Sequence, residues 1–278
     1  NYAHQAGLEV WAAIRDFDGG IGSNDESLQL LSYSSRRENL INQLIGAVMQ
    51  VGIDGINVDF AKISTDCGVH YIQFIRELSV KCRQNGIVLS VDNYVPKGYN
   101  QQYNRKEQGV MADYVIIMGY DEHNGSSLEA GSVSSYEFVK EGIEETIKEV
   151  PAEKVISGIP FFTRLWSETP KTQEELNQEA GTEAADYPMK VTSEALGMST
   201  ARDKISQAGA ETTLDETTGN NYATWEADGV TYEIWLEDAT SIEPKLQLMK
   251  ENKLAGTAAW ALGQESSDIW NLILKYVN

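Results

Sequence analysis

Carboxylate and amide side chains alternate on residues 53–61 of the 278-residue chain, which read IDGINVDFA. Successive side chains along a β-strand point to opposite faces, so Asn57, Asp59 and Ala61 are expected to share one face. A carboxylate and an amide on one face can hydrogen-bond the polar groups of a substrate. Asp54 precedes Gly55, a pair typical of turns, and this makes Asp54 a turn residue rather than a catalyst.

Carboxylate, amide and aromatic side chains also follow the other apolar segments. They are Asp16 and Asp18; Asp92 and Asn93; Tyr120, Asp121, Glu122 and His123; Phe161, Arg164 and Trp166; Trp235, Glu237 and Asp238; and Trp260. Aromatic faces stack on the apolar faces of sugar rings, whereas Asp and Asn bind hydroxyl groups. Together at one edge of a fold, these residue types predict a sugar site. For any single Trp, packing in the core is an equally good explanation.

Short apolar runs of β type alternate with amphipathic helices along most of the chain. Strands are expected at 8–17, 53–60, 87–94, 114–120, 155–162, 231–236 and 255–262, and helices at 38–50, 69–83, 136–150 and 267–277. This α/β alternation implies a parallel sheet with right-handed crossovers. Seven strands are one fewer than a (β/α)8 TIM barrel needs, and its reacting groups come from the carboxyl ends of the strands.

We therefore expect a (β/α)8 barrel whose first strand lies upstream of residue 1, because residues 1–7 read as the end of a helix stopped at Gly7. The alternative is an open doubly wound sheet, whose usual glycine-rich first loop is absent.

Residues 166–227 interrupt the alternation. They are rich in Thr, Glu, Asn and Gly, with one helix expected near 192–208 and a hairpin at 222–236 that turns at Asp228-Gly229. Such a length is too great for a plain loop in a compact domain. We expect a single catalytic domain over 1–278 with a small inserted α+β lobe at 166–230.

Composition limits the partners. The chain has 22 Lys and Arg against 42 Asp and Glu, a formal charge of −20, which argues against a nucleic-acid or anionic-membrane partner. Cys67 and Cys82 flank the helix expected at 69–83, which separates them by about 22 Å. A disulfide requires Cα atoms within about 7 Å, so both are expected to be free thiols.

The segment 54–61 (DGINVDFA) resembles the signature strand of glycoside hydrolase family 18, the chitinase-like barrels, which reads DGxxxDxE. Residues 118–121 (MGYD) are similar to the MxYD motif of that family, and Trp260 falls on the final strand, where the family places an aromatic floor. Residues 120–123 (YDEH) and 235–238 (WLED) resemble the bacterial branch that acts on peptidoglycan. The resemblance extends from Gly7 to Val277.

The resemblance implies a retaining mechanism in which the 2-acetamido oxygen of the substrate attacks the anomeric carbon. Asp59 would orient the acetamido group, and Tyr120 would hydrogen-bond its oxygen. A Glu at position 61 would protonate the leaving oxygen, but this chain has Ala61. Asn57 would belong to the same catalytic group. The implied substrate-binding residues are Asp121, Trp260, Trp235, Asp92, Asn93 and Glu122.

The resemblance further implies an N-acetylated oligo- or polysaccharide as partner, no cofactor, a monomer, and a secreted or cell-wall- or spore-associated bacterial protein. Ala61 has two explanations: a hydrolase inactivated by exchange of its acid, or a natural glycan-binding pseudoenzyme. Asp121 or Glu122 could act as a substitute acid, although each lies on a different strand from position 61.

Two other classes remain open. A metal-dependent hydrolase could use Asp59, Asp92, Asp121 and His123 as ligands. A structural or protein-binding barrel would have no reason to carry Asp59, Tyr120 and Trp260 at its strand ends.

Overall fold

The computed structural model describes residues 2–16 and 25–277. They divide into two compact units. Unit 1 comprises Asn1–Ile117, Glu144–Ile156 and Lys253–Ala255, and unit 2 comprises Met118–Ile143, Ser157–Asn252 and Gly256–Asn278. Two residues expected at the end of the first strand, Phe17 and Asp18, lie outside the described residues.

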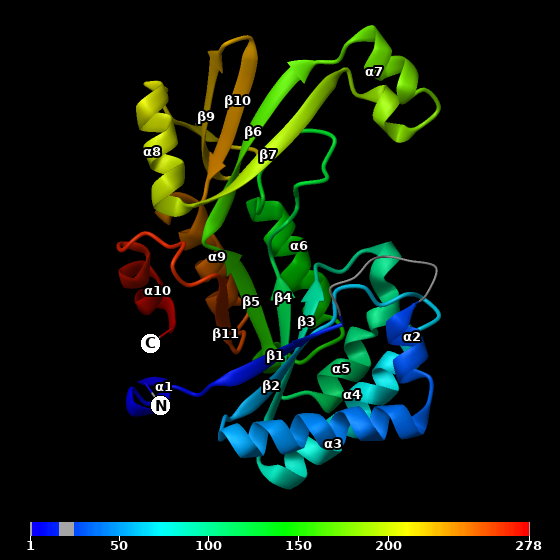
Figure 1. Ribbon diagram of the computed structural model, residues 1–278. Helices are drawn as coiled ribbons and strands as arrows, with labels where there is room; N and C mark the ends of the chain where they lie inside the picture. Colours follow the sequence, from blue (N-terminus) through cyan, green and yellow to red (C-terminus); the bar gives the residue numbers. More distant parts are fainter. Residues whose placement is uncertain (1, 17–24, 278) are drawn as a thin grey trace. The chain divides into compact units, whose positions relative to one another are not determined.

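A six-stranded sheet carries the segments in which the sequence predicted chemistry (Figure 1). Its strands are β1 (Trp11–Arg15), β2 (Gly55–Asp59), β3 (Val88–Tyr94), β4 (Tyr114–Met118), β5 (Val155–Pro160) and β11 (Gly256–Trp260), paired in that order. The β1–β2 and β2–β3 pairs are parallel. The α/β class is therefore confirmed.

The expected membership of the sheet was wrong in one strand. The segment expected at 231–236 is β10 (Val230–Leu236), which pairs antiparallel with β6 (Phe162–Pro170) and β9 (Asn220–Ala227) in a second sheet. The parallel sheet therefore has six strands in the described part of the chain, not seven. A run of alternating apolar residues predicts a strand but does not specify its partner.

The helices expected at 38–50 and 69–83 are present and slightly longer than predicted, and unit 1 has further short helices that were not predicted. The helices of unit 1 are α1 (Tyr2–Gln5), α2 (Glu26–Leu31), α3 (Ser34–Val51), α4 (Gly68–Asn85), the 3₁₀ helix η1 (Gly98–Tyr103) and α5 (Arg105–Met111), with a second 3₁₀ turn η2 (Ala152–Lys154). Both α3 and α4 end at a glycine in the left-handed region, Gly52 and Gly86. This stop is favoured because glycine has no Cβ to clash there.

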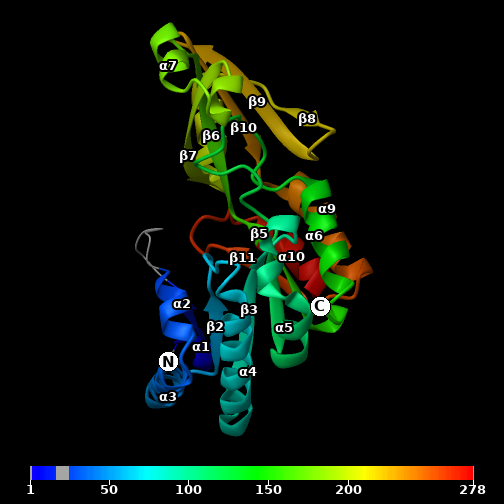
Figure 2. The same cartoon turned by 90° about the vertical axis from the view of Figure 1, so that its right-hand side faces the viewer.

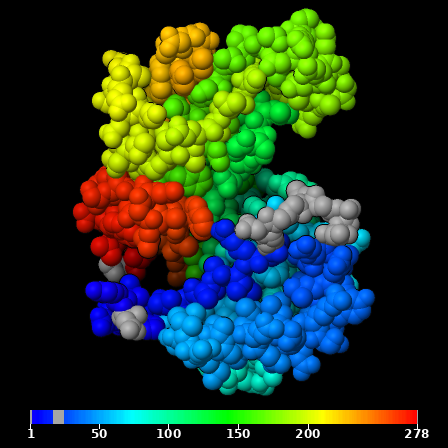
Figure 3. All heavy atoms as spheres, in the orientation of Figure 1, coloured from blue at the N-terminus to red at the C-terminus, as the bar shows by residue number. Residues whose placement is uncertain are grey.

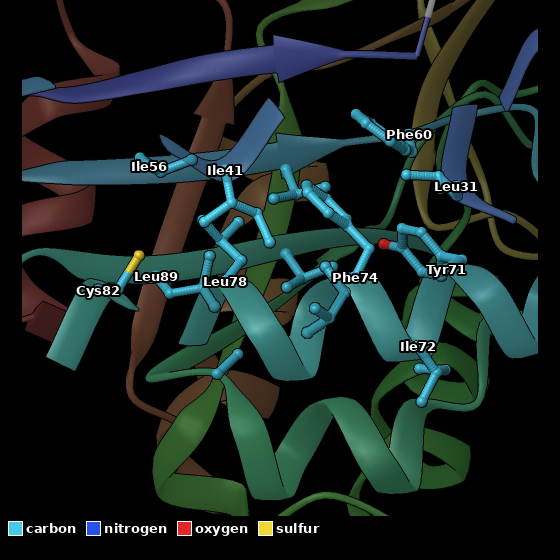
Figure 4. Packing of buried hydrophobic residues seen from close by; sticks show 14 of the residues in the cluster. Leu31, Ile41, Ile56, Phe60, Tyr71, Ile72, Phe74, Leu78, Cys82 and Leu89 are labelled. Atoms are coloured by element: carbon cyan, nitrogen blue, oxygen red, sulfur yellow. The ribbon is translucent and has the colours of Figure 1, made fainter. Parts of the chain in front are cut away.

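The apolar face of α4 forms much of the core of unit 1 (Figure 4). Phe74, Ile75 and Leu78 are fully buried, and they belong to the same cluster as Ile56 of β2 and Leu89 of β3. Burial of each such side chain contributes about 1.5–3 kcal/mol. This packing fixes β2 and β3, the strands that carry the first candidate site residues.

The cysteine prediction is confirmed. Cys67 and Cys82 are both free and buried. Burial raises the pKa of each thiol to about 12, so both stay protonated at neutral pH.

Unit 2 contains the second sheet, in the order β7-β6-β10-β9-β8, with β7 at Met189–Gly197 and β8 at Thr213–Asp215. Its other elements include α7 (Gln173–Gln178), the 3₁₀ turn η3 (Glu183–Asp186), α8 (Met198–Ala208), α9 (Ala239–Glu251) and α10 (Ile269–Val277), while α6 (Tyr136–Ile147) crosses the boundary between the units. Ala201 and Ile205 of α8 pack with Ile234 and Leu236 of β10. Figure 3 shows α7 and α8 on the surface.

The hairpin expected at 222–236 is confirmed as β9 and β10, which turn at Asp228 and Gly229, both with positive φ. The second sheet begins at Phe162, slightly before the lobe predicted for 166–230. The assignment of residues 1–278 to a single catalytic domain stays a prediction.

Candidate active site

The strand β2 presents two polar side chains on one face because its other face is held in the core. Ile56 and Val58 are fully buried, whereas Asn57 and Asp59 alternate with them and are half-buried. Gly55 begins the strand where a Cβ would lie 2.5 Å from the Trp11 ring, so no larger residue fits without displacing that ring. The predicted alternation of this strand is therefore confirmed.

Asn57 connects β2 to the neighbouring strand β3. Its Nδ2 donates to Ser90 Oγ at 2.9 Å and to Asp92 Oδ1 at 2.8 Å. The register explains both contacts, because Asn57 lies opposite Ser90 in the parallel pair. The side chains of Asn57 and Asp92 thus form one hydrogen-bonded group.

Asp92 is the most strongly perturbed carboxyl group of this region. Burial raises its pKa to about 7, and the nearby Asp59 carboxylate adds to the rise, whereas the hydrogen bond from Asn57 and the charge of Arg15 oppose it. A carboxyl group with such a pKa carries a proton for part of the time at neutral pH, as acid–base groups in active sites often do.

Asp59 pairs with Arg15, its register partner on β1. Arg15 Nε lies 2.9 Å from Asp59 Oδ2, and the Asp59 side chain is only 14% exposed while that of Arg15 is 59% exposed. The guanidinium group therefore orients the carboxylate from the solvent side. Arg15 was not identified from the sequence. Its position at the end of the strand before β2 was a signal that it could lie beside Asp59.

Ala61 lies two residues beyond Asp59 in a segment that Asp16 holds in place. The Ala61 and Lys62 amide groups donate to the Asp16 carboxylate at 3.1 and 2.7 Å. Both carboxylate oxygens of Asp16 thus accept hydrogen bonds from the backbone that follows β2. This structural role accounts for a carboxylate at the end of β1. The Ala61 methyl group has no proton to donate.

Tyr71 lies on the buried face of α4 and brings a hydroxyl group into it. Its ring is fully buried, and its hydroxyl group has no hydrogen-bond partner within the described residues. Burial raises the pKa of Tyr71, and the charges of Asp92, Asp16 and Asp59 contribute. A buried hydroxyl group close to three carboxyl groups is a feature that periodicity alone does not reveal.

Asn93 was expected to bind substrate, and its surroundings contradict that role. The side chain is 1% exposed and exchanges two hydrogen bonds with Gln108 of α5, at 2.6 and 3.1 Å. Strand alternation places Asn93 on the face opposite Asp92. We therefore remove Asn93 from the candidate site.

Unit 2 contains the residues that follow β4. The Tyr120 ring is half-buried and meets Phe162 edge-on, with ring centroids 6.0 Å apart. Asp121 has a positive φ of 60°. Desolvation raises the pKa of Asp121, and the charge of Arg164 opposes the rise.

Glu122 is hydrogen-bonded at the N-terminus of α6. Its carboxylate accepts from the Ser135 backbone amide at 2.7 Å and from Ser135 Oγ at 3.0 Å, directly before α6 begins at Tyr136. A negative charge at a helix N-terminus is stabilising because the first N–H groups of a helix have no partner within it. This arrangement argues against Glu122 as a substitute acid.

We predict that Glu122→Ala lowers the free energy of unfolding by about 1 kcal/mol, the typical cost of a lost cap. Glu122→Gln should cost less, since its amide oxygen still accepts one of the two bonds. Denaturant unfolding of the two variants beside the parent chain measures this. Equal stability of Glu122→Ala and the parent chain would show that the cap contributes nothing.

The candidate tryptophans have different environments. Trp235 lies on β10, where its Nε1 donates to Asp215 at 2.9 Å and its ring meets Tyr222 at 4.7 Å. Trp260 ends β11 and is 46% exposed. Trp166 is 1% exposed and donates to the Gly131 carbonyl, so packing explains it fully.

Glu237 is likewise structural. It is 1% exposed and pairs with the equally buried Lys245 at 2.9 Å, with further bonds from Asn220 and Ser241. Burial raises the pKa of Glu237, and Lys245 opposes that rise. A buried charge is tolerated because each partner is neutralised and hydrogen-bonded.

The predicted site residues thus form two groups. Asn57, Asp59, Ala61 and Asp92 belong to unit 1, and Tyr120, Asp121, Glu122, Trp235 and Trp260 belong to unit 2. That Asp59, Tyr120 and Trp260 line one pocket is a prediction that follows from the family resemblance.

Two findings bear on the other classes of function. Across residues 2–16 and 25–277, His, Cys, Asp and Glu form no group of three that could hold a metal ion. In the same residues, no helix is long and apolar enough to cross a membrane.

Comparison with known proteins identifies the class. Residues 6–265 match Glycosyl hydrolases family 18. The chain belongs to this family, and its parallel-stranded α/β sheet is the corresponding TIM-barrel-like fold.

Three relatives illustrate the match. The uncharacterized glycosylase YvbX of Bacillus subtilis is 26% identical over 99% of this chain and 76% of its own length. The crystal structure of the Bacillus cereus spore cortex-lytic enzyme SleL superposes with a TM-score of 0.85 at 22% identity, over 99% of this chain and 61% of that one. A GH18 chitinase from Cycas revoluta in complex with (GlcNAc)3 gives a TM-score of 0.75 at 24% identity, over 98% of this chain and 80% of that one. The chain therefore spans less than two thirds of SleL.

Proposed function

We propose that this chain binds glycans that contain N-acetylglucosamine, of the peptidoglycan or chitin type, and cleaves them poorly because Ala61 stands at the position of the general acid. The observation that carries the proposal is the β2 face, on which Asn57 and Asp59 are polar, half-buried and hydrogen-bonded while the next residue of the alternation, Ala61, has no acidic group.

In the proposed mechanism the acetamido oxygen of the substrate is the nucleophile, so the protein needs no nucleophile of its own. Asp59 orients the acetamido N–H and stabilises the positive charge that develops on the oxazolinium ion. Arg15 holds the Asp59 carboxylate at 2.9 Å, which reduces the conformational entropy lost when the substrate binds. Tyr120 donates a hydrogen bond to the acetamido oxygen, and Trp260 offers a partly exposed aromatic face to the sugar ring.

The substrate class is supported by the names of the relatives. SleL is described as a spore cortex-lytic enzyme, and the Cycas revoluta chitinase was crystallised with (GlcNAc)3. We extend N-acetylated glycan binding to this chain as a proposal, supported by its residues at 57, 59, 120 and 260.

Binding measurements test the proposal. We predict that the chain binds (GlcNAc)4 saturably. Asp59→Asn should weaken binding at least about tenfold and Tyr120→Phe about fivefold, since a hydrogen bond to a charged group contributes about 1.5–3 kcal/mol and a neutral one about 1 kcal/mol. Isothermal titration calorimetry measures the affinities. Asp203→Asn, on the exposed surface of α8, is the matched control and should bind like the parent chain.

Binding that is unaffected by both site substitutions would place the sugar elsewhere. No binding by the parent chain would refute the proposed function.

A natural glycan-binding pseudoenzyme is the second candidate. It is compatible with the segment around Ala61, because the Asp16 carboxylate accepts from the Ala61 and Lys62 backbone amides and these bonds need no particular side chain at position 61. Both candidates predict binding, and they differ in what a restored glutamate at position 61 would do.

A further inference from the structure

A groove of about 650 Å³ lies within unit 1, between the start of α4 and the segment 98–107 that contains η1 and the start of α5. Figures 1 and 2 both show α4 and α5 side by side. The volume is within the range of small-molecule sites. None of the candidate site residues lines this groove.

A close approach of two backbones shapes the groove. A Cβ on Gly68 would lie 2.7 Å from the Gln102 carbonyl oxygen, so only glycine lets η1 approach α4 this closely. Gln102 Nε2 donates to the Ile63 carbonyl at 2.8 Å, and the Ile63 amide donates to Tyr103 Oη at 3.2 Å. The groove wall is thereby fixed to the segment that leaves β2, two residues after Ala61.

Three side-chain amides line the groove, and each uses only one of its two polar groups in a hydrogen bond within the protein. Gln101 and Gln102 use their NH₂ groups to donate to backbone carbonyls, and the Asn104 side-chain oxygen accepts from the Glu107 amide. Within the described residues, the side-chain oxygens of both glutamines and the NH₂ group of Asn104 have no protein partner. The two glutamine oxygens and the Asn104 NH₂ group are thus left for a ligand.

The apolar part of the groove is unusually exposed. Tyr99 is 82% exposed and Val69 is 73% exposed. The charged side chains of the lining, Arg76 and Glu107, pair with each other at 3.2 Å. An exposed aromatic ring, unused amide groups and a neutralised charge pair favour an uncharged, hydroxyl-rich ligand over an anion or a cation.

We propose that this groove binds an N-acetylhexosamine unit of a polysaccharide, with the sugar ring on Tyr99, the hydroxyl groups at the three amides and the acetamido methyl group against Val69. The proposal rests on the proposed function, because it gives a polymeric substrate a second contact next to the segment that contains Ala61. It needs no residue of unit 2.

Methyl NMR spectroscopy of the full chain, with (GlcNAc)3 as the probe, tests the groove directly. The Val69 and Ile72 methyl signals, both from the groove lining, should shift saturably on titration. Tyr99→Ala should weaken that titration about tenfold, as expected for loss of an aromatic contact of about 1.5 kcal/mol. Tyr33→Ala removes another exposed tyrosine of unit 1 outside the groove and should leave the titration unchanged.

Two further variants keep the outcomes separate. Val69→Ser, at an exposed position, should weaken binding of the sugar in the groove while Tyr99 is kept. This variant tests the groove if Tyr99→Ala does not fold. Asp59→Asn with Trp260→Ala removes predicted contacts of the main site and should leave the Val69 and Ile72 shifts in place.

Shifts at the Trp260 indole without shifts at Val69 and Ile72 would overturn the groove proposal and leave the proposed function standing. Shifts at Val69 and Ile72 that persist in the double variant, with none at Trp260 in the parent chain, would support the groove and contradict the part of the proposed function that assigns sugar binding to Asp59 and Trp260. No shifts at either place would overturn both.

Discussion

The substitution Ala61→Glu is expected to raise the rate at which the chain hydrolyses a natural N-acetylglucosamine polymer by about 10²–10⁴-fold, the usual contribution of a general acid. The new carboxyl group would continue the alternation of Asn57 and Asp59 on the face of β2 and could protonate the leaving oxygen. Reducing-end release from peptidoglycan fragments or chitin oligosaccharides measures the rate.

Ala61→Gln is the matched control for this gain. Glutamine has nearly the size of glutamate but no acidic proton, so it should leave the rate at the level of the parent chain. A gain with glutamine equal to that with glutamate would mean that side-chain volume, not proton transfer, limits the parent chain. No hydrolysis by Ala61→Glu would favour the glycan-binding pseudoenzyme.

The contribution of Asp92 to the free energy of unfolding is expected to fall as the pH rises from about 4 to about 7. Burial raises the pKa of this carboxyl group from its usual 3.8 to about 7. Between these values the folded chain binds a proton that the unfolded chain has released, so the folded state loses stability as pH increases. Each pKa unit corresponds to about 1.4 kcal/mol, which sets an upper limit of about 4 kcal/mol.

Asp92→Asn isolates this effect, because the amide oxygen can still accept the hydrogen bond from Asn57. The variant should be more stable than the parent chain at pH 8, by up to about 4 kcal/mol, and similar to it at pH 4. Denaturant unfolding across this pH range measures the difference.

Glu77→Gln provides a control of opposite sign in the same unit. The hydrogen bond from Arg37 lowers the pKa of Glu77. The free energy of unfolding of the parent chain should therefore be higher than that of Glu77→Gln above about pH 4.5, and this difference should disappear as the pH falls. An Asp92→Asn curve that runs parallel to that of the parent chain would show that Asp92 is ionised throughout.

Much of unit 1 could be predicted from the sequence because its signals are local. The alternation of residues 53–61 correctly placed Ile56 and Val58 in the core and Asn57 and Asp59 on the other face. The same alternation rule, applied to β3, predicts that the neighbours Asp92 and Asn93 lie on opposite faces of the strand. The amphipathic pattern of residues 69–83 likewise predicted α4.

What the sequence could not supply depends on pairing between distant segments. The hairpin signal predicted the pairing of β10 with β9, but nothing in the residues of β10 indicates that β6 is its other partner. The same holds for the ion pair of Arg15 with Asp59 and for the capping of α6 by Glu122, 13 residues before Ser135. Each requires knowledge of which strands or loops are adjacent in space.

If this chain is a substrate-assisted hydrolase that lacks only its acid, as proposed, the gain from Ala61→Glu should depend on the leaving group of the substrate. The rates of the parent chain and of Ala61→Glu should be compared on a natural glycan and on a nitrophenyl N-acetylglucosaminide, whose leaving group needs little protonation. We expect a gain of about 10²–10⁴-fold on the glycan and a much smaller gain on the nitrophenyl substrate. Equal gains on both substrates, or equal rates for the two chains, would contradict the proposal.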